Sequence, residues 1–162
     1  MKVSADGKKK WALLTEKPAA TSGIPTAAEL NAGLDFSCVV LESDITWTPS
    51  ASDTVNEKVS CQRGNSVTYG ASNFDLGLTF VQEFLEAGGR DVTAGNAAYE
   101  AARVKNSEIW IYLRESEKWS TEPWADTDII ELGGRVSSDN PARVNNEGDI
   151  KRRIPFGAKE ML

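Results

Sequence analysis

The chain has 162 residues, of which 40% are hydrophobic and 26% are charged, and its net charge of −6 comes from 24 acidic and 18 basic residues. This length and composition predict one globular domain with a core of its own. The lack of histidine excludes His-dependent triads and histidine-based metal sites within the chain, and the acidic balance argues against a surface that grips nucleic acid.

Residues 1–24 show no hydrophobic periodicity and are predicted to form an extended N-terminal arm with a short strand over residues 11–15. Three lysines precede Trp11 and Leu13, and breaker residues follow them. Apolar side chains in an arm need cover from this subunit or from another, whereas a frayed terminus is the plainer alternative. The arm has no apolar stretch typical of a secretion signal, so we expect synthesis in a cytoplasm.

The next segment, "PTAAELNAGLDFSCVV", changes from a helical to a strand-like pattern. Pro25 precedes Thr26 and Glu29, whose spacing predicts a capping box at the start of a short helix. Gly33 is expected to end that helix in a left-handed conformation. The segment therefore joins the arm to a single β domain that is predicted over residues 25–162.

Residues 43–65 are polar, rich in Ser and Thr, and interrupted by Pro49. They predict a long loop or hairpin in which Trp47 and Val55 are isolated apolar residues. Loops longer than about 12–15 residues are uncommon and usually functional or disordered.

The two cysteines, Cys38 and Cys61, lie 23 positions apart and form no CxxC pair. The spacing predicts neither a zinc site nor a redox site. We expect two reduced thiols in or near the core, because cysteine is among the most buried residue types.

The clearest strand pattern is "NFDLGLTFVQEF", in which Phe74, Leu76, Leu78 and Phe80 alternate with other residues. A period of two predicts a strand with one buried face. A helix is predicted over residues 94–105.

This helix has Asp91 and Thr93 as N-cap candidates and a stripe of small side chains suited to packing on a sheet. Residues 107–115 follow as a strand with apolar side chains on both faces. Both faces are expected to be covered, and self-association is one way to cover the second.

The rest of the chain predicts more β structure. Residues 122–138 read as a turn, a strand and a Gly-Gly break, in which the glycines favour a bulge or turn, and residues 149–157 are predicted to be a final strand. Neighbouring strands with one helical crossover favour a mainly antiparallel β-sandwich or barrel with one flanking α-helix.

No sequence motif indicates an enzyme. The chain holds no P-loop, GxGxxG or GxSxG motif, and neither a cofactor, a metal nor a membrane span is expected. Its many acidic residues are most simply a solvated face, with an acidic surface that has a purpose as the other interpretation. Of the five tryptophans, Trp110 is expected in the core. Trp11 and Trp47 lie in segments that are expected to be exposed, and they fit either interfaces or the stacking of sugar rings.

Three stretches resemble the tail tube protein, or major tail subunit, of bacteriophages with long non-contractile tails (siphovirus type), particularly those of actinobacterial hosts. The first is "PTAAELNAGLDFSCVV", which resembles the segment after the N-terminal arm of these proteins. The second, "AAYEAARVKNSEIWIYLRE", resembles their helix-then-strand unit. The third is "EPWADTDIIEL" followed by "PARVNNEGDIKRRIPFGAKEM". It resembles their Pro-Trp/Phe-Ala turn, an Asp that opens a strand, and a terminal strand. Their order along the chain carries the resemblance.

The resemblance implies a structural subunit that forms hexameric rings, which stack into a tube whose β-barrel lumen conducts genomic DNA without sequence-specific binding. It implies assembly in the host bacterial cytoplasm, a place in the virion tail, and contacts with the tape measure, tail terminator and tip proteins. The arm and the long loop are expected to make the contacts between rings. An acidic lumen would repel phosphates and let the duplex slide.

The alternatives are a carbohydrate-binding β-sandwich, a tail terminator and a capsid decoration protein. Candidates for contacts between copies are Lys8, Lys9, Lys10, Trp11, Leu13, Trp47, Val55, Lys151, Arg152 and Arg153. Candidates for the joint between arm and body are Pro25, Thr26, Glu29 and Gly33. Acidic candidates for the lumen or the outer surface are Asp75, Glu108, Glu115, Asp128 and Glu131.

Overall fold

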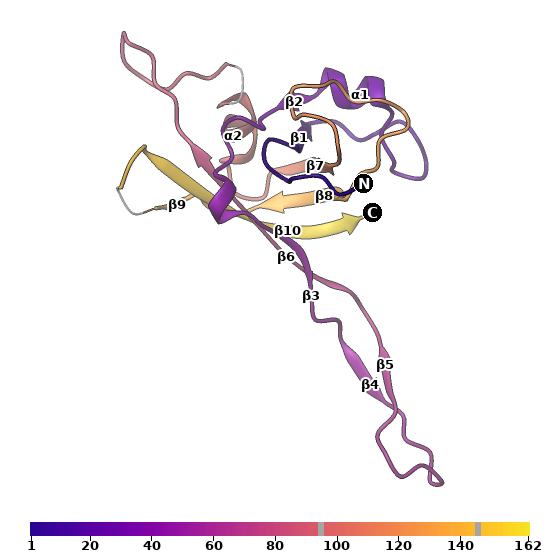
Figure 1. Cartoon of the computed structure of the whole chain (residues 1–162). Coiled ribbons are helices and arrows are strands. Elements are labelled where there is room, and N and C mark those ends of the chain that lie inside the picture. The colour runs from indigo at the N-terminus through magenta and orange to yellow at the C-terminus, as the bar shows by residue number, and fades with distance from the viewer. Residues whose placement is uncertain (94–95, 145–146) are drawn as a thin grey trace.

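The computed structural model describes residues 1–93, 96–144 and 147–162, and in these residues eight strands form one antiparallel sheet (Figure 1). The strand order is β2-β1-β7-β8-β10-β6-β3, with β9 paired to β10 beside this path, and β4 and β5 form a separate two-stranded ribbon. The prediction of a mainly antiparallel β fold is confirmed. The elements are β1 (Lys9–Leu14), α1 (Ala27–Ala32), β2 (Leu34–Asp35), a 3₁₀ turn (Glu42–Asp44), β3 (Thr46–Ser50), β4 (Thr54–Asn56), β5 (Val67–Tyr69), β6 (Asn73–Val81), α2 (Asn96–Ala102), β7 (Glu108–Glu115), β8 (Leu132–Ser138), β9 (Ala142–Arg143) and β10 (Lys151–Met161).

The sheet curls until the two ends of its strand order approach each other. Trp11 on β1 and Trp47 on β3 lie near opposite ends of that order, yet their ring centroids are 5.4 Å apart in an edge-to-face arrangement. The indole N–H of Trp47 also donates to the carbonyl of Leu132 on β8 at 3.1 Å. This curl favours the barrel-like alternative over two separate facing sheets.

The concave face of the curled sheet holds the main core. The alternating residues of β6 point into it, with Leu78 and Phe80 fully buried, as the period of two predicts. On β7, Ile109 and Ile111 face the same core. The helix α2 closes this core, because its small side chain Ala98 is fully buried and lets the helix lie close.

The opposite face of β1 and β7 is covered by the same chain. Tyr112 and Leu14 point to this side and pack with Leu30 of α1 and with Trp124 from the loop between β7 and β8. Both faces of β7 are thus covered, as the sequence indicates. The cover comes from within the subunit, so self-association is not needed at this place.

The Gly-Gly pair lies inside a strand, where a break was expected. Gly133 and Gly134 belong to β8, which pairs with β7 and β10. A Cβ on Gly133 would lie 2.5 Å from the ring of Tyr112, and one on Gly134, whose φ is 155°, would lie 1.9 Å from the carbonyl oxygen of Glu160. The glycines therefore permit close approach of neighbouring strands, and the predicted break is wrong. The bulge expected here has a counterpart on the neighbouring strand, because the pairing of β10 with β8 shifts register between Ala158 and Glu160.

The capping box of α1 is present. Thr26 accepts a hydrogen bond from the backbone N–H of Glu29, and the Glu29 carboxylate accepts one from the backbone N–H of Thr26. The hydrogen bonds from Thr26 and from the backbone of Ala19 lower the pKa of Glu29. Gly33 ends the helix with φ −73°, so the left-handed conformation expected there is wrong.

Position 33 requires glycine because a larger residue would clash with a neighbouring side chain. A Cβ there would lie 2.5 Å from the side chain of Leu14.

The predicted helix over residues 94–105 is observed as α2, and its expected start at residues 94–95 lies outside the described residues.

Candidate assembly surfaces

A long hairpin projects far from the body of the molecule (Figure 1). Its base is the pairing of β3 with β6, which ends where Ser50 pairs with Asn73. Residues 51–72, called the distal hairpin below, continue beyond this pair and contain β4 and β5, whose side chains are all exposed. The polar segment predicted as a loop or hairpin at residues 43–65 is therefore one side of a projecting hairpin.

The distal hairpin exposes apolar side chains that its own two strands do not cover. Val67 and Tyr69 lie on one face and are 54% and 75% exposed. Val55, a candidate for contacts between copies, lies on the other face and is also exposed. An isolated two-stranded hairpin is at best marginally stable in water, so this segment is suited to being stabilised by a neighbour.

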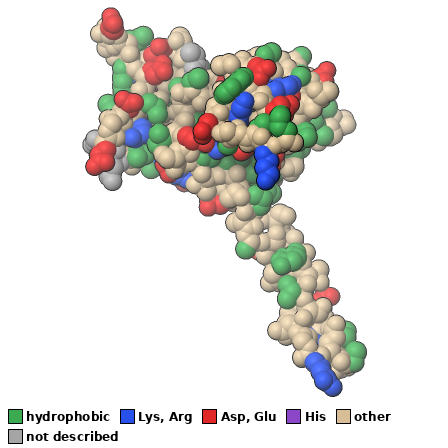
Figure 2. Space-filling view, viewed as in Figure 1, with side chains coloured by type: hydrophobic (Ala, Val, Ile, Leu, Met, Phe, Trp, Pro, Cys, Tyr) green, Lys and Arg blue, Asp and Glu red, His purple; other side chains and the backbone are tan. Residues whose placement is uncertain are grey.

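The turn of the distal hairpin, residues 57–66, is called the hairpin tip. It carries Lys58 and Arg63 with one acidic residue, Glu57. Both basic side chains are exposed and take part in no ion pair among the described residues. Figure 2 shows basic side chains at the far end of the projection. The tip therefore presents positive charge well away from the body.

A second projection, the short hairpin of residues 83–91, lies at the opposite end of β6 (Figure 1). Phe84 forms a β-bridge with Arg90, and the N–H of Leu85 donates to the carbonyl of Gly89 at 3.0 Å. Phe84 and Leu85 are 52% and 51% exposed. The short hairpin is thus a second exposed apolar surface, and Glu83 and Glu86 make it acidic.

The predicted N-terminal arm is only partly free of the body. Residues 9–14 form β1, an inner strand that pairs with β2 on one side and with β7 on the other. Trp11 and Leu13, expected at contacts between copies, are 1% and 0% exposed and belong to the core of this subunit. Backbone pairing on both sides and the aromatic cluster around Trp11 explain this difference.

The lysines of the arm contact partners within the subunit. Lys8 lies 3.4 Å from the centroid of the Trp119 ring, and Lys9 pairs with Glu42. Lys10 is buried, pairs with Asp35 at 2.9 Å and donates to the carbonyl of Ser120. These contacts hold β1 and the residue before it to the body of the subunit.

The second basic site, on β10, is also tied to the subunit. Arg153 donates to the carbonyl of Asp44 and to the hydroxyl of Thr46, both at 2.8 Å. Lys151 donates to the carbonyl of Glu147, and Arg152 to the carbonyl of Lys151. Trp47, another interface candidate, is buried in the curl of the sheet.

One acidic candidate is buried in an ion-pair network. Asp128 lies 2.8 Å from Arg114, whose side chain is fully buried, and it also pairs with Lys118. Burial favours the neutral acid, but hydrogen bonds from Lys118, from the backbone of Ala125 and from Arg114 outweigh it and lower the pKa of Asp128 to about 2. Asp128 therefore stabilises the loop between β7 and β8. The other acidic candidates, Asp75, Glu108, Glu115 and Glu131, are exposed.

Both cysteines are exposed free thiols. The expectation that they lie in or near the core is wrong for this subunit. Cys38 is in the loop after β2, and Cys61 is in the hairpin tip. The polar sequence around Cys61 is the signal that indicates its exposure.

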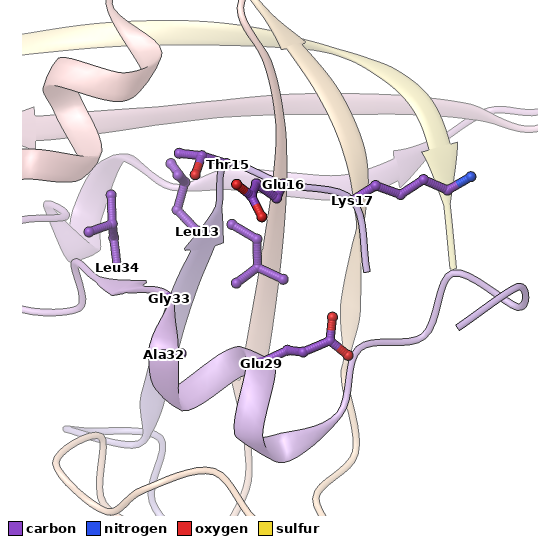
Figure 3. Close-up of a pocket in the computed structure, with 9 residues that line it drawn as sticks. Leu13, Thr15, Glu16, Lys17, Glu29, Ala32, Gly33 and Leu34 are labelled. Atoms are coloured by element: carbon purple, nitrogen blue, oxygen red, sulfur yellow. The ribbon is translucent and has the colours of Figure 1, made fainter. Parts of the chain in front are cut away.

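A shallow groove lies beside the joint between arm and body (Figure 3). It is lined by the end of β1, the segment that follows it, and α1, and it encloses about 340 Å³. Its charged side chains are Glu16, Lys17 and Glu29, and Glu29 is already used in the capping box. Pro25, the remaining joint candidate, is buried. The groove brings together no set of groups that fits a catalytic centre.

The described residues contain no group of three or more acidic or cysteine side chains placed to hold a metal ion. Within the same part of the chain, helices are too short or too polar to cross a bilayer.

A comparison with protein families matches residues 1–162 to the family described as phage tail tube protein. A comparison with curated proteins found no match.

Proposed function

The chain belongs to the phage tail tube protein family, which is structural and not enzymatic, and we propose that its copies form hexameric rings that stack into a tube conducting genomic DNA. The family supports self-assembly into a tube and a place in the virion tail. The proposal adds the ring number, the long non-contractile tail and the role of each surface.

The distal hairpin carries this proposal. It has no core of its own, exposes Val55, Val67 and Tyr69, and extends beyond the body of the subunit. Such a segment gains stability when a neighbouring copy covers it. Identical copies joined head to tail form rings where the rotation closes, and stacked rings form a filament. We assign the distal hairpin, together with the first residues of the arm, to contacts between rings.

The free edges of the curled sheet support contacts within a ring. Among the described strands, β3 pairs only with β6, and β2 is a two-residue strand that pairs only with β1. Unpaired edges favour association with another chain. Sheets joined around a six-fold axis would line one continuous lumen. Assembly in the host bacterial cytoplasm and contacts with tape measure, tail terminator and tip proteins complete the proposal.

The carbohydrate-binding alternative loses its stacking residues in this structure. Trp11 and Trp47 are buried, and the exposed indole of Trp119 is covered on one side by Lys8. A tail terminator or a decoration protein differs in the assembly it forms, since either would stop at one ring or one surface oligomer.

The test is to replace residues 51–72 by Asn-Gly. Ser50 pairs with Asn73, so a two-residue turn can close the shortened hairpin without disturbing the core. We expect wild-type protein at high concentration to form tubes in negative-stain micrographs, and the shortened chain to stay folded by circular dichroism but to form none. Tubes from the shortened chain would remove the hairpin from the stacking contact. A wild-type protein that stays monomeric at every concentration would contradict the proposed function itself.

A further inference from the structure

We propose that the basic hairpin tip of one copy docks on the acidic, apolar short hairpin of a second copy in the next ring. This inference rests on the proposed function, because it needs rings that stack in one orientation. It assigns the receiving surface, which the family match does not identify.

The two projections leave opposite ends of one strand. The distal hairpin ends at residue 72, just before β6, and the short hairpin begins at Glu83, just after it. A nine-residue strand separates them by roughly 30 Å, and they point in opposite directions in Figure 1. In a head-to-tail stack, the surface at one end of a subunit always meets the surface at the other end of the next.

The charges of the two surfaces are opposite. The hairpin tip carries Lys58 and Arg63 against the single acid Glu57. The short hairpin carries three acids, and its only basic residue, Arg90, already pairs with Glu100 of α2 at 3.2 Å. Glu83 and Glu86 are exposed and form no ion pair among the described residues.

The apolar side chains of the two surfaces also match. Val59 in the tip is 56% exposed, next to Lys58. Phe84 and Leu85 are exposed to a similar degree, and they lie between Glu83 and Glu86. Contact would therefore bury apolar side chains at the centre with opposite charges around them, which is the usual anatomy of a specific interface.

Charge reversal in the full chain tests the pairing. The tip variant is K58E/R63E, the receiver variant is E83K/E86K, and K58R/R63K is the charge-conserving control. All four substituted positions are exposed, so each variant is expected to melt like the wild type. We expect the concentration needed for tube formation to rise by at least about tenfold for each reversed variant, because like charges then face each other, and to stay unchanged for the control.

Mixing gives the decisive result. A reversed tip fits a reversed receiver, and a wild-type tip fits a wild-type receiver. An equimolar mixture of the two variants should therefore form tubes at a total concentration at which neither variant forms them alone. The quadruple variant K58E/R63E/E83K/E86K should form tubes by itself. Normal assembly of either reversed variant alone, or failure of both the mixture and the quadruple variant, would overturn the pairing.

Native Cys61 in the tip provides an independent measurement. Cys38 is replaced by Ser, and Ala87, which is exposed at the turn of the short hairpin, is replaced by Cys. Copper-phenanthroline oxidation of assembled C38S/A87C tubes should give a ladder of covalent oligomers on denaturing gels, and C38S alone and C38S/C61S/A87C should not. A different outcome is that tubes form only when residues 51–72 are present, while charge reversal has no effect and no ladder appears. This outcome would show that the short hairpin is not the receiving surface, and the proposed function would still stand.

Discussion

Arg114 is the residue on which the loop between β7 and β8 depends. Its fully buried guanidinium donates to the carboxylate of Asp128 and to the carbonyls of Trp119, Glu122 and Pro123. One side chain thus fixes the loop that covers the outer face of β7. In the sequence, Asp128 was one of many acids, and no pattern marks it as the partner of an arginine 14 positions earlier.

Asp128→Ala should leave the buried charge of Arg114 without its counter-ion. Removing one partner of a buried pair costs about 3–5 kcal/mol, so we expect the free energy of unfolding in urea to fall by about that amount. Asp128→Asn keeps an acceptor and should cost less. Asp75→Ala, on the exposed side of β6, is the matched control and should change stability little. An equal effect of D128A and D75A would contradict this role.

The low pKa of Asp128 predicts a pH dependence. Its folded-state pKa is about 2, below the value of about 3.9 for an unperturbed Asp. The stabilisation from the ionised carboxylate is therefore complete above about pH 4 and is lost as the pH falls through about 2. We expect the stability difference between wild type and D128N to shrink from pH 5 to pH 2 in urea titrations. A difference that stays constant over this range would show that Asp128 is not the titrating group.

At the scale of elements, β1 separates the structural and assembling parts of the N-terminal segment. Alternation in β6 is readable because four apolar residues, Phe74, Leu76, Leu78 and Phe80, recur with a period of two. The six residues of β1 include a lysine pair and have apolar side chains on both faces, so the sequence predicts a short strand at residues 11–15 but places it in an extended arm. Only pairing with β2 and β7 shows that they belong to the sheet.

Truncation distinguishes these two parts. Residues 1–6 are exposed, so their removal should leave the melting temperature near that of the wild type. If they contact the next ring, the truncated chain should form rings but fewer tubes. Removal of residues 1–14 takes away β1, including Trp11, and should give an unfolded chain by circular dichroism. Normal folding of the longer truncation would contradict the placement of β1 inside the sheet.

At the scale of the whole molecule, acidity is the property that bears on the passage of DNA. DNA carries about one negative charge per 1.7 Å of axis, so a negative wall repels it from every side. Asp75, Glu108, Glu115 and Glu131 are exposed in the subunit, and each would be repeated six times in a hexameric ring. These four remain the candidates for a lumen wall.

Lysine substitution of these acids, one at a time, should separate lumen from outer surface. A lysine in the lumen would attract phosphates at every ring and slow DNA release from purified particles, whereas one on the outer surface would not. Particle yield should stay normal in both cases. If none of the four variants slows release, acidic side chains do not help DNA to slide through the tube.

The sequence by itself determined the mainly β class, the helix-capping box, the strand that ends the chain and the exclusion of His-based chemistry. These features depend on local periodicity and on residue types that are present or absent. Only the tertiary structure decided that Trp11 meets Trp47, that Arg114 holds Asp128, and that two oppositely charged hairpins leave opposite ends of β6. Such contacts join residues far apart along the chain. A local sequence pattern does not specify which distant strand will pack beside a given segment.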